Sequence, residues 1–414
     1  MPLNPEISYF ARTNHRNAGV PFGIRQADRM SHTYIIGQTG VGKSTLIETL
    51  ALQDMKAGRG FAVIDPRGDL TERLAQQADE ICPERLNYFN APDRLQPYGY
   101  NPLRRVPDNL IPLAASGFLE TLKKLWPDAW GVRMEHVLRN SLFALLERDG
   151  STLPDILSLY VDEKYRKEVV KTIRNDVIKR FWLDEFENYP ARLRAEAVAP
   201  IQNKLGALLS DPVLYRMLVE PDIDLRIRPL MDNGEILLVN LSKGQLGESG
   251  THVLGGLIVS TIGLAAFSRA TIPASDRRPF FVYIDEFQSF TTLMMADMMS
   301  ELRKYGIGLI LAHQYVNQLE PDICSAVLGN AGTIISFRVG GEDTALLSRT
   351  FAPKFSVTDL LNLPNREIYL KLMIAGTPSA PFSAHSMTMS DLEQASSGPV
   401  HKPLSAPSIG TNWM

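Results

Sequence analysis

Short apolar runs recur along the chain, and most of them end in glycine or in polar residues. Runs of this length without polar interruption are typical of strands buried on both faces, as in a parallel sheet. Apolar residues at helical spacing follow several of them, so strand and helix alternate. We therefore predict an α/β core whose strands are Tyr34–Ile36, Phe61–Ile64, Glu235–Leu241, Pro279–Ile284, Gly306–Ala312 and Thr333–Arg338.

The pattern changes over residues 110–228, where turn residues become rare and helical spacing dominates. This span holds 18 basic and 18 acidic residues, so it is charge-balanced. We interpret it as an all-α domain inserted into the sheet-bearing domain, which we assign to residues 31–109 and 229–385. Its basic residues at helical spacing, which form either a solvated face or a surface for nucleic acid or an acidic partner, are Lys164, Lys167, Lys171 and Arg174.

The two ends of the chain lack a periodic pattern. Residues 1–30 read as a loop segment, and residues 386–414 are rich in Ser, Pro and Gly, which predicts disorder. One internal stretch, Val253–Ser268, is apolar enough to resemble a membrane span. It is shorter than the ~20 residues needed to cross a bilayer, so we predict a buried core helix.

A glycine-rich turn follows the first predicted strand and leads into a helix with apolar spacing over Leu46–Met55. It fills the G-x-x-x-x-G-K-[ST] pattern of a phosphate-binding loop, the Walker A motif. Glycines let backbone N–H groups turn towards phosphate oxygens, and the helix presents its positive N-terminus to them. Lys43 is predicted to reach the β- and γ-phosphates, and the Ser44 hydroxyl to ligate Mg²⁺. The predicted nucleotide-binding residues are Gly37, Gln38, Thr39, Gly40, Val41, Gly42, Lys43, Ser44 and Thr45.

An acidic motif follows the strand Pro279–Ile284, whose next residues are Asp285 and Glu286. An apolar strand that ends in adjacent acids is the Walker B pattern. We predict that Asp285 holds Mg²⁺ and that Glu286 orients and deprotonates the attacking water. Gln314, at the tip of the fifth predicted strand, is placed to sense the γ-phosphate or this water, while His313 beside it is interpreted as structural. The motifs together predict an ATPase with ATP and Mg²⁺ as ligands.

Three further charged residues have two interpretations each. Asp65 ends the strand Phe61–Ile64, where ligands bind in open α/β sheets, but the residues after it also suit simple turn chemistry. Arg338 and Arg349 lie at the end of the last predicted strand and one helix later. In a ring of subunits we predict that Arg338 acts as a finger on the neighbouring nucleotide, with Arg349 as the second candidate, and the alternative for both is a surface ion pair.

The bulk properties restrict the partners. At 414 residues the chain is long enough for two or three domains, and its net charge is −3 with a pI near 6.2. This balance excludes a protein coated in basic surface, so any nucleic-acid contact is local or is built by assembly. Cys82 and Cys324 are too few for a disulfide framework or a zinc site. Because the N-terminus also lacks the order of a signal peptide, we expect a cytoplasmic protein.

The motifs occur in an order that resembles one family. They are Ile35–Ser44, Ile64–Leu70, the helical insertion, Ile284–Phe287, Ala312–Gln314 and Phe337–Arg338. This set resembles the HerA–FtsK superfamily of DNA-pumping ATPases, and within it the type IV secretion coupling proteins of conjugation, over residues 20–385. The more specific motifs are Asp-Pro-Arg-Gly-Asp-Leu at 65–70, the place of the insertion, and Asp-Glu-Phe-Gln at 285–288.

The resemblance implies a RecA-like P-loop NTPase core, a hexameric ring and DNA running through a central channel. Lys243, in the loop after the strand Glu235–Leu241, is then a candidate pore contact, with an ordinary exposed lysine as the alternative. Typical coupling proteins begin with transmembrane helices, and no such segment is recognised here. We therefore expect docking to the inner membrane to need a partner protein.

Two other functions stay open. One is a secretion or pilus-assembly ATPase that remodels protein, and the other is a HerA-like ring that scaffolds a partner nuclease in DNA processing or defence. The corresponding partners are relaxosome, secretion-system or nuclease proteins. Stimulation of hydrolysis by DNA separates a DNA translocase from the first alternative, and a stable complex with an effector enzyme favours the second. A small-molecule kinase is disfavoured because the sequence offers no evident acceptor pocket or lid.

Overall fold

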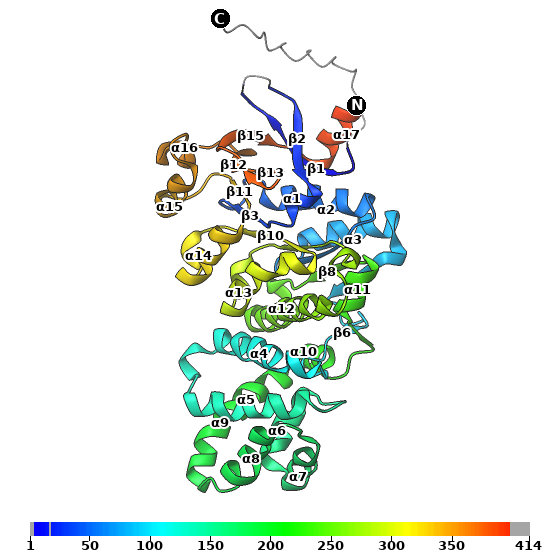
Figure 1. Ribbon diagram of the computed structural model, residues 1–414, viewed down its shortest axis with the longest axis vertical. Coiled ribbons are helices and arrows are strands. Elements are labelled where there is room, and N and C mark those ends of the chain that lie inside the picture. The colour runs from blue at the N-terminus through cyan, green and yellow to red at the C-terminus, as the bar shows by residue number, and fades with distance from the viewer. Residues whose placement is uncertain (1–3, 16–17, 398–414) are drawn as a thin grey trace, which may run out of the picture.

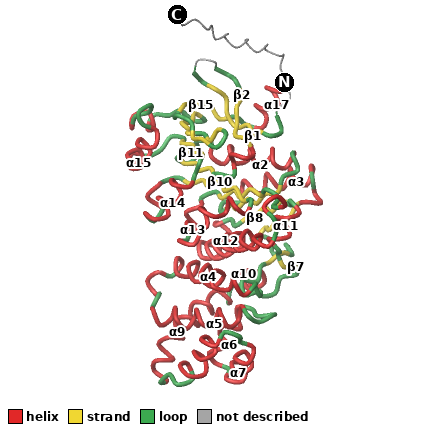
Figure 2. The backbone as a smooth tube through the Cα atoms, viewed as in Figure 1, coloured by secondary structure: helices red, strands yellow, loops and turns green. Residues whose placement is uncertain are grey.

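The computed structural model describes residues 4–15 and 18–397. The molecule is elongated, with a large sheet in the upper half of the view and a helical portion in the lower half (Figure 1). Figure 2 shows the same division by secondary structure. Helices α12 (Lys243–Ser268) and α13 (Leu293–Leu302) lie between these two parts.

The large sheet has eleven strands. They are β1 (Ile7–Thr13), β2 (Pro21–Arg25), β3 (Thr33–Ile36), β4 (Gly60–Asp65), β5 (Leu86–Asn90), β8 (Ile236–Asn240), β9 (Phe280–Ile284), β10 (Ile307–His313), β11 (Thr333–Ser336), β12 (Glu367–Lys371) and β15 (Phe382–Ser386). Their spatial order is β2-β1-β15-β12-β11-β3-β10-β9-β4-β8-β5. The strands from β11 to β5 run parallel and include all six predicted strands, and the other four join antiparallel at one edge.

Helices cover both faces of the parallel strands, because successive apolar side chains point to opposite faces. In β4, Phe61 and Val63 belong to the apolar cluster that includes residues of α2 (Lys43–Lys56) and α3 (Asp69–Ile81), whereas Ala62 and Ile64 belong to the cluster that includes residues of α12 and α13. The helices other than α12 and α13 are α1 (Gln26–Arg29), α2 (Lys43–Lys56), α3 (Asp69–Ile81), α4 (Ile111–Leu125), α5 (Val132–Leu146), α6 (Leu153–Val161), α7 (Glu163–Thr172), α8 (Asp176–Arg180), α9 (Ala191–Leu209), α10 (Pro212–Leu218), α11 (Ile227–Asn233), α14 (Pro321–Asn330), α15 (Gly341–Phe351), α16 (Val357–Leu361) and α17 (Met389–Ser397).

Helices α4 to α10 form the helical portion and fall within the predicted insertion. Aromatic side chains such as Trp182 and Phe186 are fully buried among them. Where this portion joins the core, the short strands β6 (Tyr98–Gly99) and β7 (Ile223–Asp224) pair in parallel. The segment that leads into the insertion therefore lies beside the segment that leads out of it. The predicted α/β fold with a mostly parallel sheet and an all-α insertion is confirmed.

The loop predicted for residues 1–30 is wrong over most of its length, because residues 7–13, 21–25 and 26–29 form β1, β2 and α1. Strand β1 pairs with β2 and with β15, which comes from the far end of the chain. Phe10 is only 1% exposed. The backbone of Tyr9 is also fixed on α2, because its N–H donates to Gln53 Oε1 (2.8 Å) and its carbonyl accepts from Gln53 Nε2 (2.6 Å).

The disordered tail predicted for residues 386–414 needs a similar correction at its start. Ser386 ends β15, and residues 389–397 form α17. Thr388 and Asp391 cap this helix reciprocally, since the Thr388 N–H donates to Asp391 Oδ2 (2.8 Å) and the Asp391 N–H donates to Thr388 Oγ1 (3.1 Å). Leu392 is fully buried and fixes the helix on the core. Residues 398–414 lie outside the described part of the chain.

The apolar stretch Val253–Ser268 lies within α12. Within residues 4–15 and 18–397, one helix, Lys243–Thr271, is long and apolar enough to span a membrane by length and composition, and 72% of its most apolar window is buried. The helix packs against both α4 and α13. It therefore has the place of the core helix that the sequence predicts.

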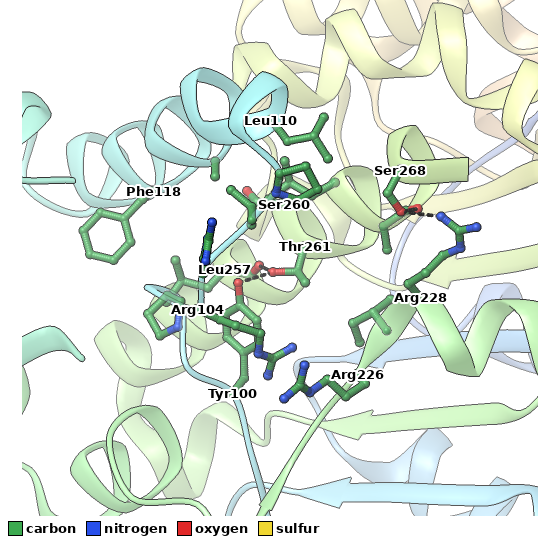
Figure 3. Close-up of a pocket in the computed structure, with 18 of the residues that line it drawn as sticks. Tyr100, Arg104, Leu110, Phe118, Arg226, Arg228, Leu257, Ser260, Thr261 and Ser268 are labelled. Carbon is green, nitrogen blue, oxygen red and sulfur yellow. Dashed lines mark hydrogen bonds between the residues drawn. The ribbon is translucent and has the colours of Figure 1, made fainter. Parts of the chain in front are cut away.

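A cavity of about 250 Å³ lies where the insertion joins the core (Figure 3). The segment that leads into the insertion contributes Arg104 and Arg105, and the segment that leads out of it contributes Arg226 and Arg228. Apolar side chains of α4 and α12 form its wall. Because Arg104 and Arg226 both pair with the Asp224 carboxylate, their charge is partly compensated within the protein.

Candidate active site

The glycine-rich loop connects β3, which is buried throughout, to α2. Gly40 and Gly42 have φ angles of 78° and 122°, where a side chain with a Cβ is strained, so the loop needs glycine at both positions. The Lys43 ammonium folds over the loop and donates to the carbonyl oxygens of Gly37 (2.6 Å) and Gln38 (2.9 Å). The first amides of α2 have no partners within the helix and provide a site for an anion.

Asp285 follows β9 and lies beside the start of α2. The Ser44 hydroxyl donates to its Oδ2 over 3.0 Å. Burial, and then the charges of Glu286 and Asp65, raise the pKa of Asp285 to about 6. A hydroxyl and a carboxylate at this distance fit Mg²⁺, which takes oxygen ligands and keeps water and phosphate in the remaining positions. Among the described residues, no group of three or more His, Cys, Asp or Glu side chains is placed to hold a metal ion.

Glu286 is held in one orientation. Its backbone is left-handed (φ 46°, ψ 47°), which is uncommon for a residue other than glycine, and the residue is 6% exposed. The carboxylate accepts from the Arg67 guanidinium, from the Gln314 side-chain amide and from Gln288 Nε2 (2.9 Å). A carboxylate fixed beside the glycine-rich loop is placed to accept a proton from a water molecule at that loop.

Gln314 connects the loop with the carboxylate. Thr39 Oγ1 donates to Gln314 Oε1 (2.6 Å), while the amide nitrogen of Gln314 donates to Glu286. The structure thus brings together Lys43 and Ser44, in the first turn of α2, with Asp285, Glu286 and Gln314, which follow the carboxyl ends of β9 and β10. This is the edge at which ligands bind in open α/β sheets.

His313 has a structural environment. The residue is fully buried, its Nε2 lies 2.5 Å from the Tyr34 hydroxyl, and its ring contacts those of Tyr34 and Phe287. Burial lowers the pKa of His313 to about 3, so the ring is neutral. These contacts agree with the structural interpretation.

The sequence profile of one family, described as the type IV secretion-system coupling protein DNA-binding domain, matches residues 14–203 and 231–352. The chain belongs to this family. The match covers more than half of the sequence and spans both the glycine-rich loop and the Asp285-Glu286 pair. No curated protein sequence matches the chain.

Solved structures share the fold of this coupling-protein family member. The plasmid coupling protein TrwB in complex with the ATP analogue ADPNP is 17% identical, with 94% of this chain and 95% of that chain covered at a TM-score of 0.62. TrwB in complex with ADP and Mg²⁺ is 17% identical, with 88% and 87% covered and a TM-score of 0.60. VirB4 of Thermoanaerobacter pseudethanolicus is 16% identical, with 93% and 97% covered and a TM-score of 0.61. At these identities the likeness establishes the fold, and the RecA-like P-loop core is confirmed.

The two arginines predicted as finger residues occupy different places in the coupling-protein fold. Arg338 lies against the glycine-rich loop of its own chain, where its Nε donates to Gln38 Oε1 (3.2 Å) and its Nη1 to the Leu363 carbonyl (3.4 Å). Arg349, in the last turn of α15, is exposed and forms no ion pair within the described part of the chain. A role across subunits stays a prediction for both, and the geometry favours Arg349 for it.

Asp65 serves its own turn. Its Oδ1 accepts from the Arg67 N–H (2.8 Å), and its Oδ2 accepts from the N–H groups of Leu70 (2.9 Å) and Thr71 (3.2 Å). Both oxygens are therefore engaged at the start of α3. The interpretation of Asp65 as a turn residue is favoured over a direct contact with nucleotide.

Three of the other basic candidates form exposed ion pairs. Lys243 pairs with Glu248 (2.6 Å), and Lys167 pairs with Glu163 one turn away. Arg174 pairs with Asp108 (2.9 Å). These pairs favour a solvated face for the basic residues of the insertion and an ordinary exposed lysine at position 243.

Sequence reasoning missed Arg67 and Gln288 as partners of Glu286. Strands β4 and β9 are neighbours with Ile64 opposite Ile284, so the segment after β4 lies beside the segment after β9. The signal was present, because Arg67 and Gln288 belong to the two specific motifs at 65–70 and 285–288. The contact of Arg67 with Glu286 depends on strand order, which the sequence pattern does not give, whereas Gln288 is only two residues from Glu286.

Proposed function

We propose that this coupling-protein family member hydrolyses ATP with Mg²⁺ as cofactor. The observation that carries the proposal is the fixed Glu286 carboxylate beside the Ser44–Asp285 pair and the glycine-rich loop. Mg²⁺, which Ser44 and Asp285 would hold, would neutralise negative charge on the phosphates. The chain's own groups do the rest: Lys43 exchanges two carbonyl oxygens for phosphate, Gln314 orients the water, and Glu286 accepts its proton. The solved complexes of TrwB with ADP and Mg²⁺ and with ADPNP support this assignment.

We further propose that hydrolysis drives DNA through a ring of these subunits, most simply a hexamer, in conjugative transfer or type IV secretion. The family description as a DNA-binding domain supports this step. A net charge of −3 is compatible with it, because a ring concentrates a few basic residues of each subunit around one pore. Contacts with phosphates make binding insensitive to sequence and steeply dependent on salt.

The test combines ATPase rates with and without DNA and the oligomer mass of the same sample. Displacement of a triplex strand then reports movement, with Glu286→Gln as the control that binds ATP without hydrolysing it. We expect DNA to stimulate hydrolysis and ATP to drive displacement. The translocase proposal is refuted if the oligomer hydrolyses ATP, DNA does not stimulate this hydrolysis, and no triplex strand is displaced.

A protein-remodelling secretion ATPase is the second candidate. The fold is as similar to VirB4 as to TrwB, with TM-scores of 0.61 and 0.62, so the fold does not choose between the two relatives. ATPase activity that responds to a secretion-system protein and not to DNA favours this candidate.

We also propose a cytoplasmic location with docking at the inner membrane through a partner protein. The motivation is the buried position of the single span-like helix of the described residues. Cell fractionation with and without the secretion-system proteins tests it, and membrane association in their absence contradicts it.

A further inference from the structure

One ammonium group of the insertion reaches the turn that follows Glu286. Lys124, near the C-terminal end of α4, donates to the carbonyl oxygens of Gln288 (2.5 Å) and Thr291 (2.8 Å) and to Thr291 Oγ1 (3.0 Å). An ammonium group has three donors. The full donor capacity of Lys124 is therefore directed at this one turn of the core.

The same turn leads directly to the candidate base. Gln288 Nε2 donates to Glu286 Oε2 (2.9 Å). The other side-chain atom, Gln288 Oε1, is buried and has no hydrogen-bond partner among the described residues. Gln288 is thus held by Lys124 at its carbonyl and by Glu286 at its amide, and a single residue separates the insertion from the carboxylate.

The turn also has hydrogen bonds of its own. The Ser289 N–H donates to the Glu286 carbonyl (3.0 Å), the Phe290 N–H donates to the Phe287 carbonyl (2.9 Å), and the Thr291 hydroxyl donates to the Gln288 carbonyl (3.2 Å). These bonds lie within the turn and do not involve Lys124. What Lys124 adds is a connection between this turn and a helix of another structural part.

The connection crosses an open boundary. Lys124 lines a cleft of about 470 Å³ between insertion and core, together with Lys123, Thr291 and Glu320. Lys124 is exposed, so its replacement opens no cavity in the core. A shift of α4 relative to the core changes the three ammonium contacts at once, because all three acceptors belong to the core.

We propose that Lys124 is a positioning residue through which movement of the insertion sets the orientation of Glu286. The inference rests on the proposed function, in that Glu286 is the base of ATP hydrolysis and DNA stimulates that hydrolysis. In this arrangement Lys124 contacts neither the nucleotide nor the attacking water. It holds the backbone carbonyl of Gln288, and the side-chain amide of Gln288 holds Glu286. It gives the insertion control over the rate of the chemical step without control over nucleotide binding.

The experiment compares Lys124→Met, which removes the donors, with Lys124→Arg, which keeps charge and donors. Lys123→Met is the matched control, because it removes the same charge from the same cleft and Lys123 donates no hydrogen bond to the turn within the described residues. The readouts are kcat and KM for ATP with and without DNA, and amide hydrogen exchange in residues 286–292. We expect Lys124→Met to lose the stimulation by DNA at unchanged KM, with exchange about tenfold faster in the turn. Lys124→Arg and Lys123→Met keep the stimulation.

Two results overturn the proposal. One is normal stimulation in Lys124→Met, and the other is equal loss in Lys123→Met, which assigns the effect to general positive charge. If DNA fails to stimulate the unmodified protein, the proposed DNA motor fails by itself. The connection from Lys124 to Glu286 is then tested by hydrolysis without DNA. A kcat that changes at constant KM in Lys124→Met and is normal in Lys124→Arg supports the connection. Unchanged kcat and unchanged hydrogen exchange in Lys124→Met refute it.

Discussion

A buried ion pair ties the N-terminal segment to the nucleotide-binding core, and its removal is expected to be costly. Arg29 and Asp54 are 1% and 0% exposed, and they form two hydrogen bonds of 2.7 and 2.8 Å. The Tyr283 hydroxyl, from β9, donates to the same carboxylate (2.6 Å). The Arg29 guanidinium also lies 3.6 Å from the centre of the Phe281 ring. The Asp54→Asn change leaves this buried guanidinium without its main counter-charge.

The expected loss is about 3–5 kcal/mol of unfolding free energy, the usual cost of breaking a buried pair from one side. The same helix supplies a control. Glu48, also on α2, accepts three hydrogen bonds from Arg73 (3.1, 3.1 and 2.8 Å), but the side chains of Glu48 and Arg73 are 24% and 48% exposed. For this exposed pair, Glu48→Gln is expected to cost about 0–1 kcal/mol.

Urea unfolding of both variants, followed by far-ultraviolet circular dichroism, measures the difference. Tryptophan fluorescence is unsuitable for the core, since Trp126, Trp130 and Trp182 lie in the insertion and Trp413 lies in the terminal residues. A double-mutant cycle with Arg29→Met then isolates the pair from the separate contributions of its members. Equal losses in Asp54→Asn and Glu48→Gln refute the reasoning, because Asp54 is fully buried and also accepts from Arg59 and Tyr283, whereas the Glu48–Arg73 pair is partly exposed.

Four predictions concern the candidate site. Lys43→Ala should abolish binding of a fluorescent ATP analogue, and near-normal hydrolysis by this variant contradicts the assignment of the loop. Glu286→Gln should bind ATP with Mg²⁺ and leave it unhydrolysed, whereas turnover within about a few-fold of the parent excludes Glu286 as the base. When Arg349→Ala subunits are mixed with active ones, hydrolysis should fall by more than the fraction of mutant subunits, and strict proportionality to that fraction counts against a shared site. Arg338→Ala should instead weaken nucleotide binding in its own subunit. Because the pKa of Asp285 is raised to about 6, its ionised form is lost as the pH falls through that value. The Mg²⁺ concentration needed for half-maximal hydrolysis should therefore rise about tenfold from about pH 7 to about pH 5. A Mg²⁺ requirement that does not change with pH contradicts this prediction.

The sequence predicts the parallel core well because its strands are buried on both faces and so lack polar interruptions. The glycine-rich loop and the Asp285-Glu286 pair are local patterns, and their chemistry depends on neighbours in sequence. Strand β1 was missed for the opposite reason. Its seven residues are stabilised by pairing with β15, which lies at the other end of the chain, and local propensity carries no trace of that partner.

The contacts of Glu286 show the same limit within the site. Gln314 was predicted because it ends a recognisable strand, whereas the role of Arg67 depends on β4 lying next to β9. Asp65 was open between two roles, and hydrogen bonds to Leu70 and Thr71 favour the turn. Helix α17 was a different kind of failure, because its Thr388–Asp391 capping box was readable in the sequence.

The cavity beside the paired strands β6 and β7 has a mechanical consequence. Both chain segments that connect the insertion to the core line this cavity, so the connection between the two parts lies next to an empty space. The insertion extends from that connection along the longest axis of the molecule, with α7 and α8 at its far end (Figure 1). It therefore has the geometry of a lever arm, in which a small rotation at the void becomes a larger sweep at the tip.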